Sequence, residues 1–128
     1  MDQQDFSISS TIKRKLPRLR FTHIKTAVLG SKYDLSLVFI GKQKMQTLNR
    51  TYRSKDYATD ILSFPISDTM GEIYICRDIS DKKSKDFDRT PNNYLEFVFI
   101  HGCVHLLGHD HGEKMDTLEK KFQKKFSL

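Results

Sequence analysis

The sequence predicts an α+β fold in which strands and amphipathic helices pack as a sandwich around one buried helix. Apolar runs typical of strands and helical patterns of apolar residues occur without the regular alternation of a parallel α/β protein. The segment from Tyr94 to Leu107 is apolar nearly all round, with Glu96 as its one charged residue besides the histidines. A helix of this kind is normally buried, so it is expected at the centre. The length suits a single domain, residues 1–128.

The first third of the chain predicts a helical segment, a strand and a second helix. Residues 10–29 carry apolar side chains mostly at helical spacing, although Pro17 interrupts the first half of the pattern. Residues 34–41 form a short apolar run that ends at Gly41, which indicates a well-buried strand. Residues 42–53 predict an amphipathic helix. Its apolar stripe consists of Met45, Leu48 and Tyr52.

The middle of the chain predicts two further strands and an exposed connection. Residues 59–65 indicate a strand that ends at Pro65, and residues 71–76 indicate another. Residues 81–88 are rich in charge and are expected to form a loop or an irregular exposed helix. These elements lead directly into the apolar segment.

Local signals mark both ends of the central helix. Thr90 supplies a capping side chain and Pro91 suits the first helical position. The helix should run to Leu107, with Gly108 adopting the left-handed conformation that stops it. A last amphipathic helix is expected over about 112–126. Its apolar residues are Met115, Leu118 and Phe122, with lysines on the other side.

Charge is distributed unevenly along the chain, whose net charge is +6. Residues 10–55 contain twelve Lys and Arg but one acid, Asp34, whereas residues 56–100 contain five basic and nine acidic residues. A cationic N-terminal third fits a nucleic-acid or anionic-membrane partner. It equally fits a solvated face of a basic protein, and Lys25 is an example of a residue expected on that surface.

The composition predicts a cytoplasmic protein. Two cysteines do not make a disulfide framework, which indicates a reducing compartment. The sequence MDQQDFSISS at the N-terminus has two acids and no apolar run, so no secretory signal is expected. The longest apolar runs are about four residues, far below the roughly 20 that span a bilayer, and no membrane partner is expected.

Four of the five histidines lie in HGCVHLLGHDH, residues 101–111. His101 and His105 are four residues apart and share one face of the predicted helix. Gly108 would let the chain turn back, so that His111 can supply a third nitrogen to the same ion. Single buried histidines are usually core residues, but three at this spacing indicate a metal site. Nitrogen ligation favours zinc, although nickel, cobalt and iron are compatible.

The residues around the ligands refine this site. The spacing matches H-E-x-x-H-x-x-G-x-x-H of zinc proteases, but Gly102 stands where a protease holds its catalytic Glu. Three protein ligands leave one coordination position open, which is typical of catalytic zinc. Cys103 should face away, about 200° around the helix from His101, and belong to the core.

Two residues beside the ligands each have two possible assignments. His109 is a competing third ligand, but two residues from His111 it should point elsewhere. Asp110 is a candidate to hydrogen-bond a ligand and fix its tautomer, or to cap the turn after Gly108.

Three blocks of the sequence resemble the YbeY family, bacterial metal-dependent endoribonucleases of ribosomal RNA maturation. Residues 101–111 are similar to H-G-x-L-H-L-x-G-Y-D-H. LNRTYRSKDYATDILSFP, residues 48–65, is similar to L-N-x-x-Y-R-x-K-D-x-x-T-D-V-L-S-F-P, and GEIYIC, residues 71–76, to G-D-I-x-I-S/C. The blocks occur in family order, whereas the first forty residues match no family motif.

The resemblance implies a site, a fold and a substrate. It implies zinc held by His101, His105 and His111, with Arg53 as a functional arginine near the metal. It implies a small mixed sheet packed beside a metal-binding central helix, loosely like the zincins. The implied activity is single-strand-specific cleavage of ribosomal RNA precursors, at the 16S 3′ end, in ribosome maturation and quality control. The implied partners are therefore RNA and the small ribosomal subunit.

The chain departs from the family pattern at three places. His109 stands where the family usually has tyrosine, which removes a hydroxyl near the metal. Val104 replaces a common leucine, and the segment 66–70 is shorter than in many members. The shorter segment would alter substrate preference if it shapes the RNA cleft.

The sequence is compatible with more than one role for Arg53, more than one cleavage mechanism and more than one function. Without the resemblance, Arg53 is interpreted as an exposed cation at a helix end. The resemblance of residues 48–65 to the family favours a role in binding a phosphate. Attack by metal-bound water and attack by the RNA 2′-OH are both compatible with the motif. A different metal-dependent hydrolase, such as a peptidase or amidohydrolase, and a non-catalytic zinc-containing ribosome-binding module are the alternatives. Gly102 argues against the peptidase.

Overall fold

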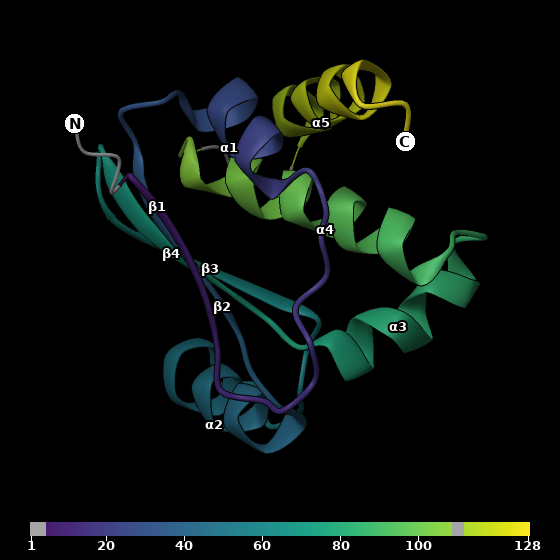
Figure 1. Ribbon diagram of the computed structural model, residues 1–128. Helices are drawn as coiled ribbons and strands as arrows, with labels where there is room; N and C mark the ends of the chain where they lie inside the picture. The colour runs from purple at the N-terminus through teal and green to yellow at the C-terminus, as the bar shows by residue number, and fades with distance from the viewer. Residues whose placement is uncertain (1–4, 109–111) are drawn as a thin grey trace.

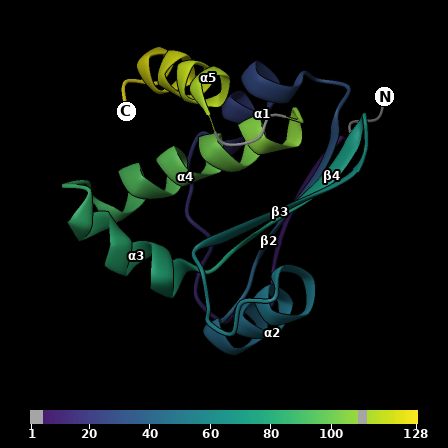
Figure 2. The ribbon, with the colours of Figure 1, turned by 180° about the vertical axis from the view of Figure 1, so that it is seen from behind.

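A computed structural model of the chain describes residues 5–108 and 112–128. The elements are, in order, β1 (Phe6–Ser10), α1 (Phe21–Leu29), β2 (Asp34–Phe39), α2 (Lys42–Arg53), β3 (Ile61–Ser67), β4 (Met70–Ile75), α3 (Arg77–Asp86), α4 (Pro91–Leu106) and α5 (Glu113–Lys125). Helix α4 crosses one face of the sheet, with α1 and α5 packed on it, and α2 lies on the opposite side of the sheet (Figure 1). The view from behind shows α3 beside the first half of α4 (Figure 2). This arrangement confirms the predicted α+β class.

The sheet is mixed and has the strand order β1-β2-β4-β3. Strands β1, β2 and β4 run parallel to one another, whereas β3 runs antiparallel to β4. The strand predicted over residues 59–65 does not end at Pro65, because β3 continues to Ser67, and the prediction is wrong on this point. An edge strand tolerates a proline, since one of its sides needs no backbone donor. The pairing shifts register between Pro65 and Ser67.

The N-terminal segment differs from the helical pattern expected over residues 10–29. Strand β1 was not predicted, and it pairs in parallel with β2. The helix begins only at Phe21, after an irregular stretch that contains Pro17. The apolar side chains of this stretch still pack against the core, so their spacing reflects packing of an irregular chain. They are Ile12, Leu16 and Leu19.

The middle helices largely agree with the sequence pattern. Helix α2 covers the predicted range and buries Met45 and Asn49, but Tyr52 of the expected apolar stripe is 61% exposed. Tyr52 packs edge-on against Phe64 at the edge of the sheet, with ring centroids 5.5 Å apart. The segment expected as a loop or irregular helix is regular helix α3, which begins earlier, at Arg77, and buries that residue against the irregular stretch before α1.

Helix α4 forms the centre of the hydrophobic core, as its composition predicts. The Thr90 side chain accepts a hydrogen bond from the backbone N–H of Asn93 at 3.1 Å, which caps the helix start. Gly108 follows the helix with a φ of +91°, a left-handed value that suits glycine. Cys103 is fully buried in the core, as expected. No helix of the described residues is both long and apolar enough to cross a membrane.

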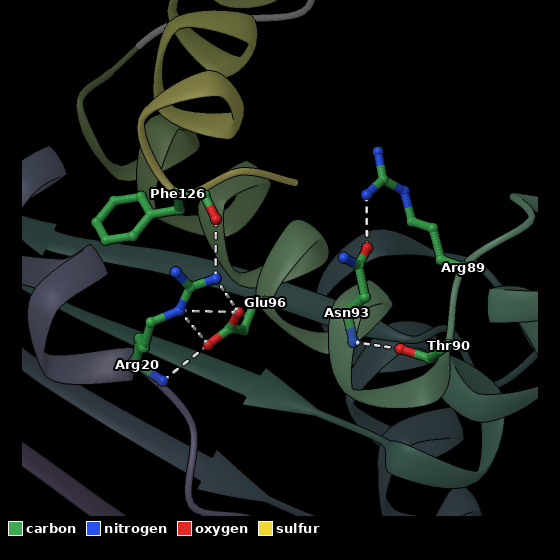
Figure 3. A network of polar contacts seen from close by, with 6 residues as sticks. All are labelled: Arg20, Arg89, Thr90, Asn93, Glu96 and Phe126. Atoms are coloured by element: carbon green, nitrogen blue, oxygen red, sulfur yellow. Dashed lines mark hydrogen bonds and ion pairs between the residues drawn. The ribbon is translucent and has the colours of Figure 1, made fainter.

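The buried charge of α4 is satisfied by one arginine. The Glu96 carboxylate accepts hydrogen bonds from the backbone N–H of Arg20 at 2.8 Å and from its Nη2 at 2.7 Å. The same Nη2 donates to the Phe126 carbonyl at 2.9 Å, so this pair links α1, α4 and the chain end after α5 (Figure 3). Burial alone would raise the pKa of Glu96, but the Arg20 hydrogen bonds and charge outweigh it and lower that pKa.

Part of the basic N-terminal third is neutralised within the fold. Lys25 is not on the surface, as the charge pattern suggested, but only 2% exposed, with its Nζ donating to the Ser31 carbonyl at 3.2 Å. Burial lowers the pKa of Lys25. Arg14 pairs with Asp81 at 2.7 Å and with Asp78 at 3.7 Å.

Candidate active site

The histidine pair lies on one face of α4, as the four-residue spacing predicts. The His101 and His105 rings are nearly perpendicular, with centroids 4.8 Å apart. Both residues are partly exposed. The third predicted ligand, His111, lies outside the described residues, as do His109 and Asp110. No cluster of three ligand-type side chains occurs within residues 5–108 and 112–128.

A carboxylate from α5 contacts the first histidine. Oε1 of Glu119 meets Nδ1 of His101, and the Glu119 side chain is only 14% exposed. An ionised carboxylate can only accept, so Nδ1 of His101 is the donor in this contact. Metal-binding histidines usually have such a partner. The sequence analysis did not single out Glu119, because only the packing of α5 on α4 brings it to His101.

A cavity of about 580 Å³ opens beside the two histidines. It runs along the edge strand β3, from the end of α2 to the exposed face of α4. Both histidines and Arg53 line it, so the structure brings together three of the predicted site residues. The other residues that line it are Asn49, Lys55, Tyr57, Thr59, Asp60, Ile61, Leu62, Ser63, Phe87, Tyr94, Phe97 and Val98.

The guanidinium of Arg53 is held in place at the wall of this cavity. Its Nη2 donates to the Ser63 carbonyl at 2.9 Å, and its Nη1 donates to the Tyr52 carbonyl at 3.1 Å. The Cζ atom lies 4.6 Å from the Phe64 ring centroid, within the range of a cation–π contact. These contacts orient the planar group at the wall shared with the histidines.

Gly102 allows α4 to approach the sheet. A Cβ atom at this position would lie 2.6 Å from Ile61 Cδ1 and 3.0 Å from Ser63 Oγ. The Ser63 hydroxyl also donates to the Gly102 carbonyl at 3.2 Å. The glycine between the histidines is therefore explained by close packing against β3, and a glutamate side chain has no room there.

Two buried polar residues, neither assigned a role from the sequence, hold the rim of the cavity. The Asn49 side chain donates to the Tyr57 carbonyl at 2.8 Å and so fixes the segment after α2. Asp60 accepts from the Tyr94 hydroxyl at 2.8 Å and lies 3.5 Å from Nζ of Lys83. Burial, followed by the Asp60 charge and hydrogen bond, raises the pKa of Tyr94, which therefore stays a neutral donor at physiological pH.

Comparison with known proteins identifies the family of this chain. The sequence model described as Endoribonuclease YbeY matches residues 1–127. The chain belongs to the YbeY family. An Endoribonuclease YbeY of Alkaliphilus metalliredigens is 33% identical over 107 residues, which cover 75% of this chain and 69% of that protein. One of Staphylococcus carnosus is also 33% identical over 107 residues, or 74% of this chain and 70% of the relative.

A solved structure shares the fold. The solution structure of TM1509 from Thermotoga maritima superposes with a TM-score of 0.66 and 24% identity, covering 95% of this chain and 91% of that protein. In this YbeY-family chain, the described parts of two sequence blocks face the same cavity. Residues 48–65 supply Arg53 and residues 101–111 supply the histidine pair.

Proposed function

We propose that this YbeY-family protein is a zinc-dependent endoribonuclease that cleaves single-stranded RNA. The observation that carries the proposal is the shared cavity, in which two imidazoles of α4 face the same space as the Arg53 guanidinium. Imidazoles suit a transition metal, and a planar guanidinium suits a phosphodiester. Family membership supports RNA as the polymer.

The donor set fits a zinc ion. His101 and His105 offer two nitrogens from one helix face, and the Glu119 contact at Nδ1 orients the His101 ring. In the proposal, His111 supplies the third nitrogen, so that α4 becomes a zincin-like metal-binding helix with one coordination position left for water or substrate. Zinc in such a site polarises a phosphoryl oxygen or lowers the pKa of bound water to about 7.

The residues of the chain itself provide binding and charge. Arg53 presents a fixed guanidinium to a phosphate oxygen and stabilises the negative charge that develops during cleavage. Because stacking on Phe64 and the Ser63 carbonyl already orient the group, little reorganisation is needed when RNA binds. Asp60, which lines the same cavity, pairs with Lys83 and accepts from the Tyr94 hydroxyl, which offsets its charge and reduces repulsion of the RNA backbone.

The family resemblance supports a narrower proposal about the substrate. We propose that the RNA is precursor ribosomal RNA, cleaved near the 16S 3′ end during ribosome maturation and quality control in the cytoplasm. The small ribosomal subunit is then the partner on which the enzyme acts. Exposed basic residues of the N-terminal third, such as Lys13 and Arg18, support contact with the RNA backbone.

The test couples metal analysis to RNA cleavage. Purified protein should contain about one zinc ion per chain and cut a single-stranded RNA, whereas the corresponding duplex stays intact. His105→Ala should lose both metal and cleavage. His23→Ala, at the exposed histidine of α1, is the matched control and should keep both. A cyclic phosphate at the new end would indicate attack by the 2′-OH. Full cleavage by metal-free protein would contradict the proposal, and zinc binding without any cleavage would favour a structural metal.

A further inference from the structure

Three aromatic rings form a cluster at the end of the cavity near α3. Phe87 and Tyr94 are nearly parallel, with centroids 5.3 Å apart and an angle of 30°. Phe97 lies 5.7 Å from Tyr94 and 6.0 Å from Phe87. All three residues line the cavity that contains the histidines. Tyr94 is buried, whereas Phe87 is 52% exposed, so Phe87 forms the exposed side of this aromatic cluster.

The backbone holds Phe87 in this exposed position. Phe87 caps α3, and Asp88 follows in the left-handed region with a φ of +57°. The backbone N–H of Arg89 donates to the Ser84 carbonyl at 2.9 Å, and that of Asp88 donates to the Lys85 carbonyl at 3.2 Å. This pair of bonds defines a Schellman motif, formed here without glycine. The large apolar side chain is therefore fixed at the cavity mouth.

The aromatic cluster adjoins the proposed metal site and is flanked by positive charge. Phe97 precedes His101 by four residues, so the two side chains share one face of α4, about 6 Å apart along the axis. The Arg89 guanidinium lies 4.1 Å from the Phe97 ring centroid. It donates to the Asn93 side chain at 2.6 Å, which fixes its position (Figure 3). Lys55 and Arg53 line the same cavity.

We infer that the exposed face of Phe87 stacks an unpaired nucleobase next to the phosphate that is cleaved. This inference rests on the proposed function and assigns a base-binding subsite to the same cavity. An aromatic face flanked by cations suits a nucleotide, because the base needs a ring surface and its phosphate needs a positive partner. A base held in a duplex is already stacked and paired. The subsite thus supplies a structural reason for selecting single strands.

The experiment measures RNA affinity after removal of the Phe87 ring from the protein, of one base from the RNA, or of both. Single-stranded oligoribonucleotides, each with one abasic position, are titrated against the protein with chelator present to prevent cleavage. Phe87→Ala should weaken binding of the intact strand roughly tenfold, in the range known for loss of one stacked base. Phe87→Trp should restore the affinity, because it restores a ring. Ile66→Ala, at a similarly exposed apolar residue of β3, should bind like the parent protein.

The abasic series distinguishes stacking from a structural effect. The parent protein should lose affinity when one particular base is absent, and Phe87→Ala should be indifferent to that loss. The salt dependence of binding should stay unchanged, because no phosphate contact is removed. If the parent protein cleaves single strands but Phe87→Ala behaves like Ile66→Ala, the subsite is wrong while the proposed function stands. If neither protein binds or cleaves single-stranded RNA, both are overturned.

Discussion

The Ser63 hydroxyl donates a hydrogen bond to the carbonyl oxygen of Gly102, at 3.2 Å, between the two histidines of α4. The backbone carbonyl of the same serine accepts from Arg53. One residue of the edge strand therefore fixes the guanidinium relative to the helix that carries His101 and His105. This connection explains how Arg53, from residues 48–65, is held in place relative to the histidine pair, from residues 101–111.

Gly102 provides the first test, because its environment leaves no space for a side chain. Alanine is preferred over glycine in a helix by about 1 kcal/mol, but overpacking costs about 1–3 kcal/mol. Gly102→Ala should thus lower the free energy of unfolding. The penalty should be smaller in an Ile61→Val background, which removes the Cδ1 atom that lies closest. Urea unfolding of the two single variants and the double variant measures this coupling, and a more stable Gly102→Ala protein would refute the packing argument.

The zinc-protease spacing leads to a related prediction. Gly102→Glu recreates the H-E-x-x-H pattern, yet we expect no peptidase activity, because the glutamate cannot be accommodated against Ile61 and Ser63. The variant should be less stable than Gly102→Ala. A peptide-hydrolysis assay on folded, zinc-loaded protein checks this expectation, and measurable hydrolysis would place the site closer to proteases than we conclude.

The Arg20–Glu96 pair predicts a stability that depends on pH. Glu96→Gln should lower the free energy of unfolding near pH 7 by about 2 kcal/mol, typical of hydrogen bonds to a charged group. Because the folded pKa of Glu96 is lowered, the stabilisation is present above its unfolded pKa and is lost as pH falls through its folded pKa. The difference between parent and variant should therefore shrink in acid. A constant difference from neutral to acidic pH would show that the carboxylate charge is not responsible.

Arg53 should be needed for cleavage but not for metal binding. Arg53→Ala should reduce the cleavage rate strongly, and Arg53→Lys should not restore it, since lysine lacks the planar two-pronged donor. Zinc content and fold should survive both changes. The control for loss of a positive charge is an exposed basic residue of the N-terminal third. Lys25 is buried, so the exposed Lys13 is used. Lys13→Ala should weaken RNA binding slightly and lower the salt slope by about one unit per phosphate contact. Equal cleavage by Arg53→Ala and Lys13→Ala would reduce Arg53 to part of the basic surface.

Glu119 should tune the zinc affinity through His101. Removing the hydrogen-bond partner of a ligand histidine commonly costs 10–100-fold in metal affinity, so Glu119→Ala is expected to bind zinc about 10–100-fold more weakly. Glu119→Gln should recover part of the loss, because its amide oxygen can accept from Nδ1. Competition with a chromophoric chelator gives the affinity without any cleavage assay. Asp116→Ala, at an exposed acid of the same helix, is the control. An unchanged affinity in Glu119→Ala would show that the contact only joins α5 to α4.

Local signals account for the parts of the fold that the sequence predicted. The cap at Thr90, the apolar composition of α4 and the stop at Gly108 all act within a few residues, and α4 follows them closely. Strand β1 depends on pairing with β2, about 29 residues further along, so no local pattern reveals it. The strand end predicted at Pro65 is wrong for the same reason, because a strand tolerates a proline when it lies at the edge of the sheet, as β3 does.

Some residues of the candidate site could likewise be predicted from local sequence patterns, and others could not. Helical spacing alone placed His101 and His105 on one face, and the structure confirms that placement. Arg53 could be chosen from other cations only through the family resemblance, since its approach to α4 requires the folded sheet. Glu119 and Phe87 carry no sequence signal of their own, because packing of separate helices brings Glu119 to His101 and Phe87 to the cavity. The role of His111 as a ligand stays a prediction.

The edge strand has a consequence for how copies of this protein meet in solution. An unpaired strand edge is a template for intermolecular pairing and aggregation. On β3, Arg53 occupies the Ser63 carbonyl, Pro65 offers no N–H donor, and the register shift next to it distorts the strand. The contact that orients the arginine thus also blocks a point where a foreign strand would attach. Loss of Arg53 would expose that acceptor and favour self-association through β3.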